Sequence, residues 1–438
     1  MQMFNKLIKN LQLELKNNEP DERKGFMIVS EKIKYFTMIL LSLGILFSSL
    51  LFNHPDEIIT GLMKIIVAPS ILVTDYMVVG NIGASFFNCG LLMIIAIIIA
   101  RKNDVNMNGP VMAAVFTIGG FALFGKNLYN IWPIMIGVLL HARFQKEKFS
   151  KFILIAFFGT ALGPMISQIS FGFGLPVVYS LPLGIGIGLL AGFCLPPLAN
   201  HFVRFHQGFN LYNIGFTAGI TGMIFMALFR SFNFENPSTH IAAEGLNRPL
   251  VVYLMILFSC MLIIGLLLSR RVLPGLLHIW RQSGRLVSDF VSSDGFGPTI
   301  MNMALLGFLS TFYVLLVGGQ LNGPIIGGIF TIVGFGAFGK HVKNIVPVMA
   351  GIYLATFFQV WSPSSTGALL AALFGTTLAP IAGTYGPLYG LIAGFVHMAM
   401  VMNVGYLHGG MNLYNNGFSG GFVAAVLVPI FDSLKKTS

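Results

Sequence analysis

Two copies of an Asn-Leu-Tyr-Asn sequence place amide and phenol groups at the start of apolar stretches. Their polar residues are Asn210, Tyr212, Asn213, Asn412, Tyr414 and Asn415. An amide without a partner in hydrocarbon costs about 2–7 kcal/mol, so these side chains must meet other polar groups, water or a solute. They could line a path for a small polar solute, or they could cap helices and join them by hydrogen bonds. Their recurrence favours the path slightly.

Two acidic residues also recur, each just before a glycine-rich entry to an apolar segment. Asp75 lies in Thr-Asp-Tyr and Asp289 in Ser-Asp-Phe. An ionisable group at membrane depth is a functional candidate, here for a coupling ion or a cationic substrate. The alternative is that both carboxylates cap helix N-termini, where an anion is favoured by about 0.3–1 kcal/mol. Asn88 and Asn302 match in the same way and join the predicted solute path.

His206 and His408 recur in His-x-Gly-x-Asn and could sense pH or relay protons. A solvent-facing position at the membrane interface is the simpler expectation. The Asn-Gly-Pro triplets at 108–110 and 322–324 predict helix starts with proline in the first turn. A sharper interpretation is that they begin half-helices whose N-termini point at an anionic group.

A glycine-rich sequence ends in lysine in both copies, at Lys126 and Lys340. The second copy spells GxGxxG, but no strand precedes it and the first copy lacks the middle glycine. Small-residue packing between helices is therefore expected in place of a nucleotide site. The two lysines are expected to end helices, where a cation suits the dipole, on opposite faces of the membrane.

The composition indicates that most of the chain lies in a lipid bilayer. Of 438 residues, 55% are hydrophobic and only 9% are charged, against about 25% charged in a soluble domain. Mean hydropathy is +0.81. This excludes a soluble enzyme, a secreted disulfide scaffold and a disordered chain, and predicts an all-α polytopic membrane protein. The net charge of +11 belongs to loops between apolar runs, so no nucleic-acid partner is expected.

Apolar segments approach the length needed to cross a bilayer core of ~30 Å. They lie at 35–53, 80–100, 108–125, 128–143, 152–170, 177–199, 208–230, 250–268, 299–318, 322–339, 344–360, 366–383, 386–403 and 410–431. Alternating basic loops place both termini in the cytoplasm. The pattern supports fourteen crossings, or twelve if one matching pair is re-entrant. Two further stretches, 59–79 and 270–298, predict interfacial or re-entrant segments.

The chain is internally duplicated. Residues 108–137 align without gaps onto 322–351, with sixteen of thirty positions identical. About seven segments per copy, an odd number, leave the copies inverted, which is typical of transporters and channels with a path between the repeats. The predicted organisation is a cytoplasmic segment at 1–34, repeats at 35–232 and 249–431, an external loop at 233–248 and a cytoplasmic tail at 432–438.

The duplicated Asn-Gly-Pro, Phe-Gly-Lys and Asn-Leu-Tyr-Asn motifs resemble those of a prokaryotic integral-membrane family of unknown function. Gly83-Ala84-Ser85-Phe86-Phe87-Asn88 and Gly208-Phe209-Asn210 are faintly similar to pieces of urea transporters. That resemblance implies a short pore helix leading into an Asn-rich turn in each inverted half. The Leu-Pro-x-x-Thr signature of urea transporters is absent.

The leading prediction is a channel or facilitative transporter for a small polar solute, in the cytoplasmic membrane. An ion-coupled transporter or cation channel using Asp75 and Asp289 is the alternative. A lipid-active membrane enzyme or assembly factor is the third. No hydrolase or metal-site motif is present in the sequence. The sequence therefore predicts a non-enzymatic protein without cofactor or metal, whose partners are the bilayer, a small solute or ion, and a second copy of the chain in a homo-oligomer.

Overall fold

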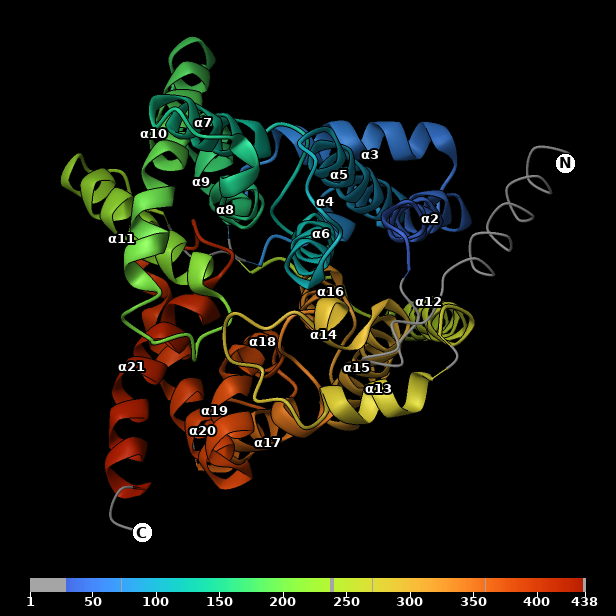
Figure 1. The fold of residues 1–438 in the computed structure, drawn as a ribbon. Helices are drawn as coiled ribbons and strands as arrows, with labels where there is room; N and C mark the ends of the chain where they lie inside the picture. The colour runs from blue at the N-terminus through green and yellow to red at the C-terminus, as the bar shows by residue number, and fades with distance from the viewer. Residues whose placement is uncertain (1–28, 72, 237–239, 270, 359, 436–438) are drawn as a thin grey trace, which may run out of the picture.

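The structure is a computed structural model that describes residues 29–71, 73–236, 240–269, 271–358 and 360–435. Over these residues the chain is built from helices, and its two copies occupy the two halves of Figure 1. The helices of the first copy are α2 (Glu31–Ser48), α3 (Pro55–Val67), α4 (Tyr76–Val79), α5 (Ile82–Lys102), α6 (Gly109–Phe121), α7 (Ile131–Phe144), α8 (Ile153–Gly159), α9 (Gly163–Ser167), α10 (Val177–Phe202) and α11 (Asn213–Ser231). Those of the second are α12 (Asn247–Leu267), α13 (Val272–Ile279), α14 (Phe290–Asp294), α15 (Phe296–Leu316), α16 (Gly323–Phe335), α17 (Val342–Phe358), α18 (Thr366–Gly375), α19 (Ala379–Tyr385), α20 (Pro387–Val404) and α21 (Asn415–Lys435).

Ten helical segments of the described chain are long and apolar enough to cross a membrane, five in each copy. This number is lower than the twelve to fourteen expected from hydropathy. The segments expected to cross at 108–125 and 322–339 form α6 and α16, of 13 residues each. At 1.5 Å per residue these helices are ~20 Å long, too short for a hydrocarbon core of ~30 Å. The predicted interfacial stretches contain the short helices α4, α13 and α14 and most of α3.

Equivalent helices of the two copies pack against each other in opposite directions. Phe116 of α6 and Phe330 of α16 occupy the same repeat position, and their ring centroids are 6.2 Å apart. Further along, Gly120 lies against Gly327. In the other direction along α6, Ala113 lies against Gly334. The two helices are therefore antiparallel about an approximate two-fold axis, as inverted repeats require.

Close approach of α6 and α16 depends on glycine. A Cβ added to Gly120 would lie 2.6 Å from the carbonyl oxygen of Gly327, and one added to Gly327 would lie 2.6 Å from that of Gly120. The glycine-rich sequences are thus helix-packing elements, as predicted. Every residue of α6 and α16 is buried, and Figure 1 shows the two helices at the centre of the molecule.

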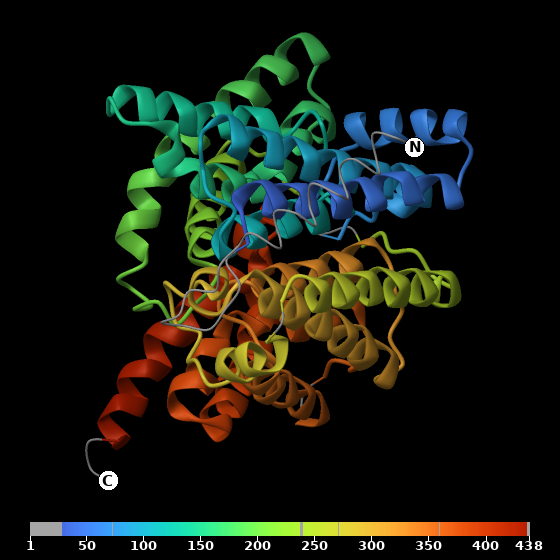
Figure 2. The same cartoon turned by 45° about the vertical axis from the view of Figure 1, so that its right-hand side comes forward.

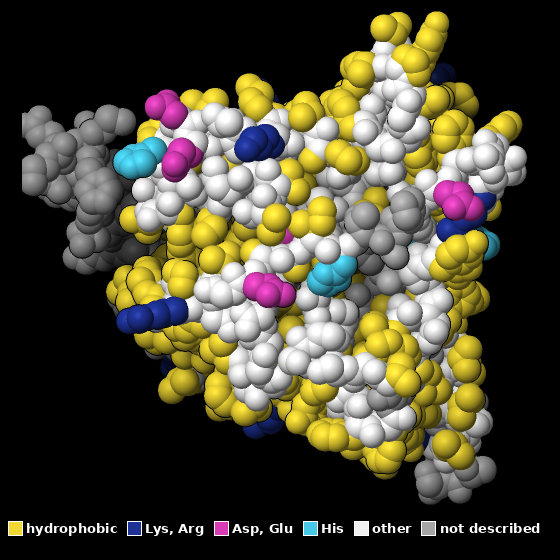
Figure 3. Space-filling view, turned by 180° about the vertical axis from the view of Figure 1, so that it is seen from behind, with side chains coloured by type: hydrophobic (Ala, Val, Ile, Leu, Met, Phe, Trp, Pro, Cys, Tyr) yellow, Lys and Arg dark blue, Asp and Glu magenta, His cyan; other side chains and the backbone are white. Residues whose placement is uncertain are grey.

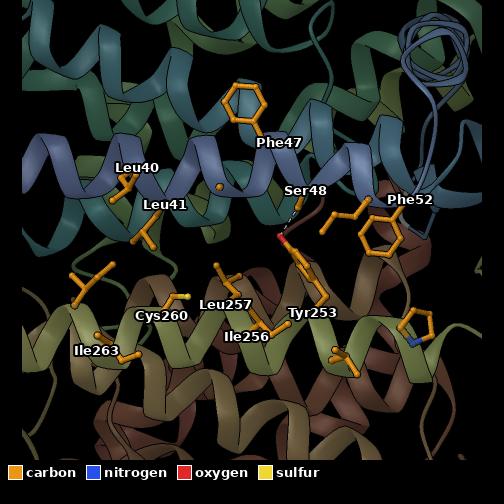
Figure 4. Close-up of a pocket in the computed structure, with 15 residues that line it drawn as sticks. Leu40, Leu41, Phe47, Ser48, Phe52, Tyr253, Ile256, Leu257, Cys260 and Ile263 are labelled. Carbon is orange, nitrogen blue, oxygen red and sulfur yellow. Dashed lines mark hydrogen bonds between the residues drawn. The ribbon is translucent and has the colours of Figure 1, made fainter. Parts of the chain in front are cut away.

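Helices α2 and α12 form a second pair of equivalent helices. They lie side by side in Figure 2, and Figure 4 shows them antiparallel, with Ser48 of α2 next to Tyr253 of α12. The Ser48 hydroxyl lies 3.3 Å from the Tyr253 hydroxyl. Between the helices is an apolar groove of about 790 Å³, and the exposed Cys260 contributes to it. The space-filling view of Figure 3 shows hydrophobic side chains spread over this face, with few charged ones.

One helix in each copy is broken at the same repeat position. After α8 the chain forms a 3₁₀ turn at Thr160–Leu162 before α9, and after α18 it forms one at Thr376–Leu378 before α19. Pro164 and Pro380 explain both breaks, because a proline ring clashes with the carbonyl four residues earlier, here that of Thr160 or Thr376. These breaks leave irregular backbone inside the bundle.

Candidate functional site

Asp75 joins the two copies of the chain. It caps α4 by accepting a hydrogen bond from the Met77 amide at 2.9 Å. Its other oxygen accepts from Ala243 in the linker between the copies, at 2.9 Å, and from Gly323, the first residue of α16, at 3.2 Å. Asp75 is 0% exposed. Its carboxylate is therefore occupied by three backbone amides, one of them at the N-terminus of a half-length helix of the other copy.

Asp289 makes the equivalent contact in the opposite direction, from the second copy to the first. Its Oδ1 accepts hydrogen bonds from Val291 at 3.1 Å and Ser292 at 3.3 Å, which caps α14, and from Gly109 at the start of α6 at 2.9 Å. A Cβ on Gly109 would lie 2.8 Å from this carboxylate oxygen, and one on Gly323 would lie 2.3 Å from Asp75 Oδ1. Glycine is thus needed at both contacts. The two Asn-Gly-Pro helices do point their N-termini at anionic groups, and these are the aspartates of the opposite copy.

Asn88 and Asn302 form hydrogen bonds at the C-terminal ends of α6 and α16. The Asn88 amide nitrogen donates to the carbonyls of Ala122, at 2.7 Å, and Lys126, at 2.8 Å. Asn302 donates equally to Gly336, at 2.7 Å, and Lys340, at 2.8 Å. Carbonyls at a helix C-terminus lack intrahelical partners, and these amides supply them. Both residues were predicted to line a solute path, and the structure places their amide nitrogens on the backbone that carries the two lysines.

The Asn-Leu-Tyr-Asn loops cross to the broken helices of the opposite copy. The Leu413 amide donates to the carbonyl of Ala161 at 3.1 Å, and the Leu211 amide donates to that of Thr377 at 3.0 Å. The rings of Tyr212 and Tyr414 lie against each other, with centroids 5.0 Å apart. Each loop therefore uses a carbonyl at the other copy's helix break, and the two tyrosines meet at the two-fold axis.

Lys126 and Lys340 lie in the protein interior. Both were expected at opposite membrane faces, and that prediction is wrong, because each is 0% exposed. The Lys126 ammonium lies 5.0 Å from the Phe121 ring centroid, and the Lys340 ammonium lies 4.5 Å from that of Tyr212. Short α6 and α16 end inside the bundle, so the residues that follow them remain buried. These lysines and two further pairs of residues at equivalent repeat positions are all buried, and we name the six the central cluster: Lys126, Lys340, Tyr212, Tyr414, Thr160 and Thr376.

A family profile described as a protein of unknown function, DUF1576, matches residues 54–231 and 268–433, more than three quarters of the chain. The chain belongs to the DUF1576 family. No curated protein and no solved structure matches it. The two matched stretches contain all residues of the central cluster and the contacts of Asp75 with Gly323 and of Asp289 with Gly109, whereas α2, α12 and Ala243 lie outside them.

The two repeated histidines of this DUF1576 protein are buried, which contradicts their expected solvent-facing position. His206 is 1% exposed, and its Nε2 lies 3.0 Å from Asn213 Oδ1. His408 is 0% exposed and makes the same contact with Asn415 at 2.8 Å. Burial lowers the pKa of His206 to about 4. Each histidine thus orients the second asparagine of its own motif, which also donates to the preceding helix, at Ala199 or Val401.

Among the predicted path residues of the DUF1576 protein, the structure brings together Tyr212 and Tyr414, each flanked two residues earlier by buried Asn210 or Asn412. Asn213 and Asn415 bind the histidines, and Asn88 and Asn302 bind the ends of α6 and α16. Sequence reasoning missed Lys126 and Lys340 as site residues. Their signal was present, since both copies repeat the Phe-Gly-Lys sequence at the end of an apolar run.

The chemistry of the central cluster is that of hydrogen-bond donors in a water-excluded space. Ammonium, phenol and hydroxyl groups can bind an acceptor or an anion. Within the described chain, salt bridges join Lys34 to Glu31, Lys151 to Glu147 and His278 to Asp294, and none includes a lysine of the cluster. The described residues contain no group of three or more His, Cys, Asp or Glu that could hold a metal ion.

Proposed function

We propose that this protein is a membrane transporter that carries a small polar solute along a path between its two inverted repeats. The path would pass the helix breaks at Thr160 and Thr376. The observation that carries this proposal is the meeting of two broken helices and two crossing loops at the two-fold axis. Irregular backbone at membrane depth is tolerated where it is buried in protein or lines a cavity. Transporters built from inverted repeats bind solutes at such discontinuous helices.

A facilitative carrier explains the geometry better than an open pore. Tyr212 and Tyr414 are 2% and 1% exposed, so the centre is closed to both sides in this conformation. The ion-coupled alternative has less support, because the carboxylates of Asp75 and Asp289 already accept backbone hydrogen bonds that join the copies. From the basic loops of the sequence we further propose that the protein lies in the cytoplasmic membrane with both termini inside the cell. We also propose that it works without catalysis and that copies can associate.

Flux into liposomes tests the transport role. Purified protein is reconstituted, and entry of small neutral, anionic and cationic solutes is followed with and without proton or sodium gradients. We expect saturable entry of at least one solute without a gradient. Thr376→Trp should abolish it by filling the helix break, whereas Gly44→Trp, on α2 where an added Cβ meets no atom within 4 Å, should not. Flux no greater than that of empty liposomes for every solute would contradict the proposal.

A further inference from the structure

The two lysines of the central cluster have different surroundings despite their equivalent positions. Lys340 Nζ donates to the Tyr212 hydroxyl at 2.5 Å and to the Thr376 hydroxyl at 2.7 Å. Lys126 Nζ has no hydrogen-bond partner among the described residues, and neither has the Tyr414 hydroxyl. Tyr414 is the repeat equivalent of Tyr212. One half of the pseudo-symmetric centre is therefore internally satisfied, and the other half presents unpaired donors.

The unpaired groups lie on segments that pack together. A Cβ added to Gly125 would lie 2.6 Å from the Leu413 side chain, so the residue before Lys126 contacts the residue before Tyr414. Thr117 neighbours the Tyr414 hydroxyl. The Thr117 hydroxyl donates its own proton to the carbonyl of Ala113, at 2.7 Å. It does not meet the geometry of a hydrogen bond with Tyr414.

Asn412 contributes a third unpaired donor, and its repeat equivalent Asn210 does not. In the second copy, the Thr377 hydroxyl donates to Asn210 Oδ1, and Asn210 Nδ2 donates to the Gly417 carbonyl at 2.9 Å. The first copy has Ala161 at the position of Thr377, so Asn412 Oδ1 accepts only from the Tyr414 amide, at 3.1 Å. Asn412 Nδ2 is buried and has no partner in the described chain. The same half of the centre thus contains an ammonium, a phenol and an amide NH₂ group, each without a hydrogen-bond partner in the described chain.

These three groups share one chemical requirement, because each offers a hydrogen to an acceptor. An ammonium buried without a counter-charge is costly, and buried charges in proteins are paired. No described acidic side chain lies within salt-bridge distance of Lys126. A bound anion would satisfy the ammonium charge and the neighbouring donors together.

We propose that Lys126, Asn412 and Tyr414 form a binding site for a small anion, either a halide or the carboxylate group of a small acid. The equivalent residues Lys340 and Tyr212 bond to each other and serve the fold. The identity of this anion as transported solute rests on the proposed function, but its binding can be measured without transport.

Anion binding to the purified full-length protein tests the site. Melting temperature is recorded against sodium chloride, sodium acetate and the reference salt sodium methanesulfonate, whose anion is neither a halide nor a carboxylate, at constant ionic strength. We expect saturable stabilisation of the wild type by chloride or acetate, and the more effective of the two salts tells a halide site from a carboxylate site. Lys126→Met should weaken this anion at least 10-fold, and Lys340→Met should change its affinity less than 2-fold.

A second pair of variants, with conservative substitutions, tests the site if a lysine variant does not fold. Tyr414→Phe removes one unpaired hydroxyl and should weaken the anion about 3- to 10-fold, whereas Tyr212→Phe should leave it within 2-fold. Equal losses in the two members of a pair, or no anion effect on the wild type, would overturn the site. Anion binding that depends on Lys126 without flux in liposomes would overturn the transport role alone. Saturable flux of a neutral solute without anion binding would overturn the anion site alone.

Discussion

Asp75 offers a sharp distinction between a residue that joins the repeats and one that binds a coupling ion. Its carboxylate accepts hydrogen bonds from Met77, Ala243 and Gly323, and it is fully buried. A hydrogen bond to a charged group contributes about 1.5–3 kcal/mol, and a buried unpaired N–H costs about 1–3 kcal/mol. Asp75→Ala leaves three amides without their acceptor and should therefore lower the free energy of unfolding by about 3–6 kcal/mol.

Asp75→Asn refines this prediction, because its amide oxygen can keep the bonds from Ala243 and Gly323 while its NH₂ group faces the Met77 amide. The expected cost is about 1–3 kcal/mol, from one lost bond. Asp289→Ala should cost less, about 1–2 kcal/mol, since Asp289 is partly exposed and water can replace its oxygens.

The assay is the apparent melting temperature of each purified variant in one detergent. At roughly 2 °C per kcal/mol for a large domain, Asp75→Ala should melt about 6–12 °C below the wild type. The largest loss is expected for Asp75→Ala, with smaller losses for Asp75→Asn and Asp289→Ala. An Asp75→Asn protein that melts like the wild type and loses only an ion dependence of flux would refute the joining role and restore the ion-coupled alternative.

Three further variants probe the packing, the lysine supports and the buried histidines. Gly120→Ala should lower the melting temperature by several degrees, because its Cβ would lie 2.6 Å from a backbone oxygen. The control Gly44→Ala should leave the melting temperature unchanged. Equal melting temperatures of the two variants would contradict the close packing of α6 against α16. Asn88→Leu should reduce liposome flux more than it reduces the amount of folded protein, since it frees the backbone of Lys126, and undiminished flux per folded molecule would speak against that support. For His206, whose pKa falls from 6.5 to about 4 on folding, up to about 3 kcal/mol of stability is present above pH 6.5 and is lost as the pH falls towards 4. His206→Gln should remove this contribution to the acid sensitivity. A pH profile of the melting temperature that matches the wild type would show that His206 makes no such contribution.

Local signals in the sequence predicted helix starts well. Asn108 and Asn322 cap α6 and α16, with proline in the first turn, and Asp75 and Asp289 cap the short helices that follow them. The cross-contact of each aspartate with the other copy could not be predicted, because it depends on how two repeats 214 residues apart pack.

Hydropathy failed where buried non-helical chain is as apolar as a membrane span. Residues 122–125 continue the apolar run of α6, yet they form a turn, so the crossing expected at 108–125 is a 13-residue helix. The same limit explains Lys126. Charge patterns distinguish loops from spans on the assumption that every loop lies at a membrane face. That assumption fails for a half-length helix such as α6, because the loop that follows it lies inside the protein.

The predicted repeats at 35–232 and 249–431 stay predictions; the helices from α2 to α11 lie between Glu31 and Ser231, and those from α12 to α21 between Asn247 and Lys435. The linker predicted at 233–248 contributes backbone contacts to Asp75, and residues 237–239 lie outside the described chain, as do residues 1–28 of the N-terminal segment and 436–438 of the tail. The sides on which the linker and termini lie remain predictions from charge.

Labelling of single cysteines at the two helix breaks tests most directly whether a solute path runs between the repeats. In a cysteine-free background, Thr160→Cys and Thr376→Cys are reconstituted and treated with a small charged thiol reagent, with Gly44→Cys as the lipid-facing control. We predict that both break positions react, that a transported solute slows the reaction, and that the control does not react. Cysteines at the breaks that stay as unreactive as the control, whichever side the reagent is added to, would contradict the existence of such a path.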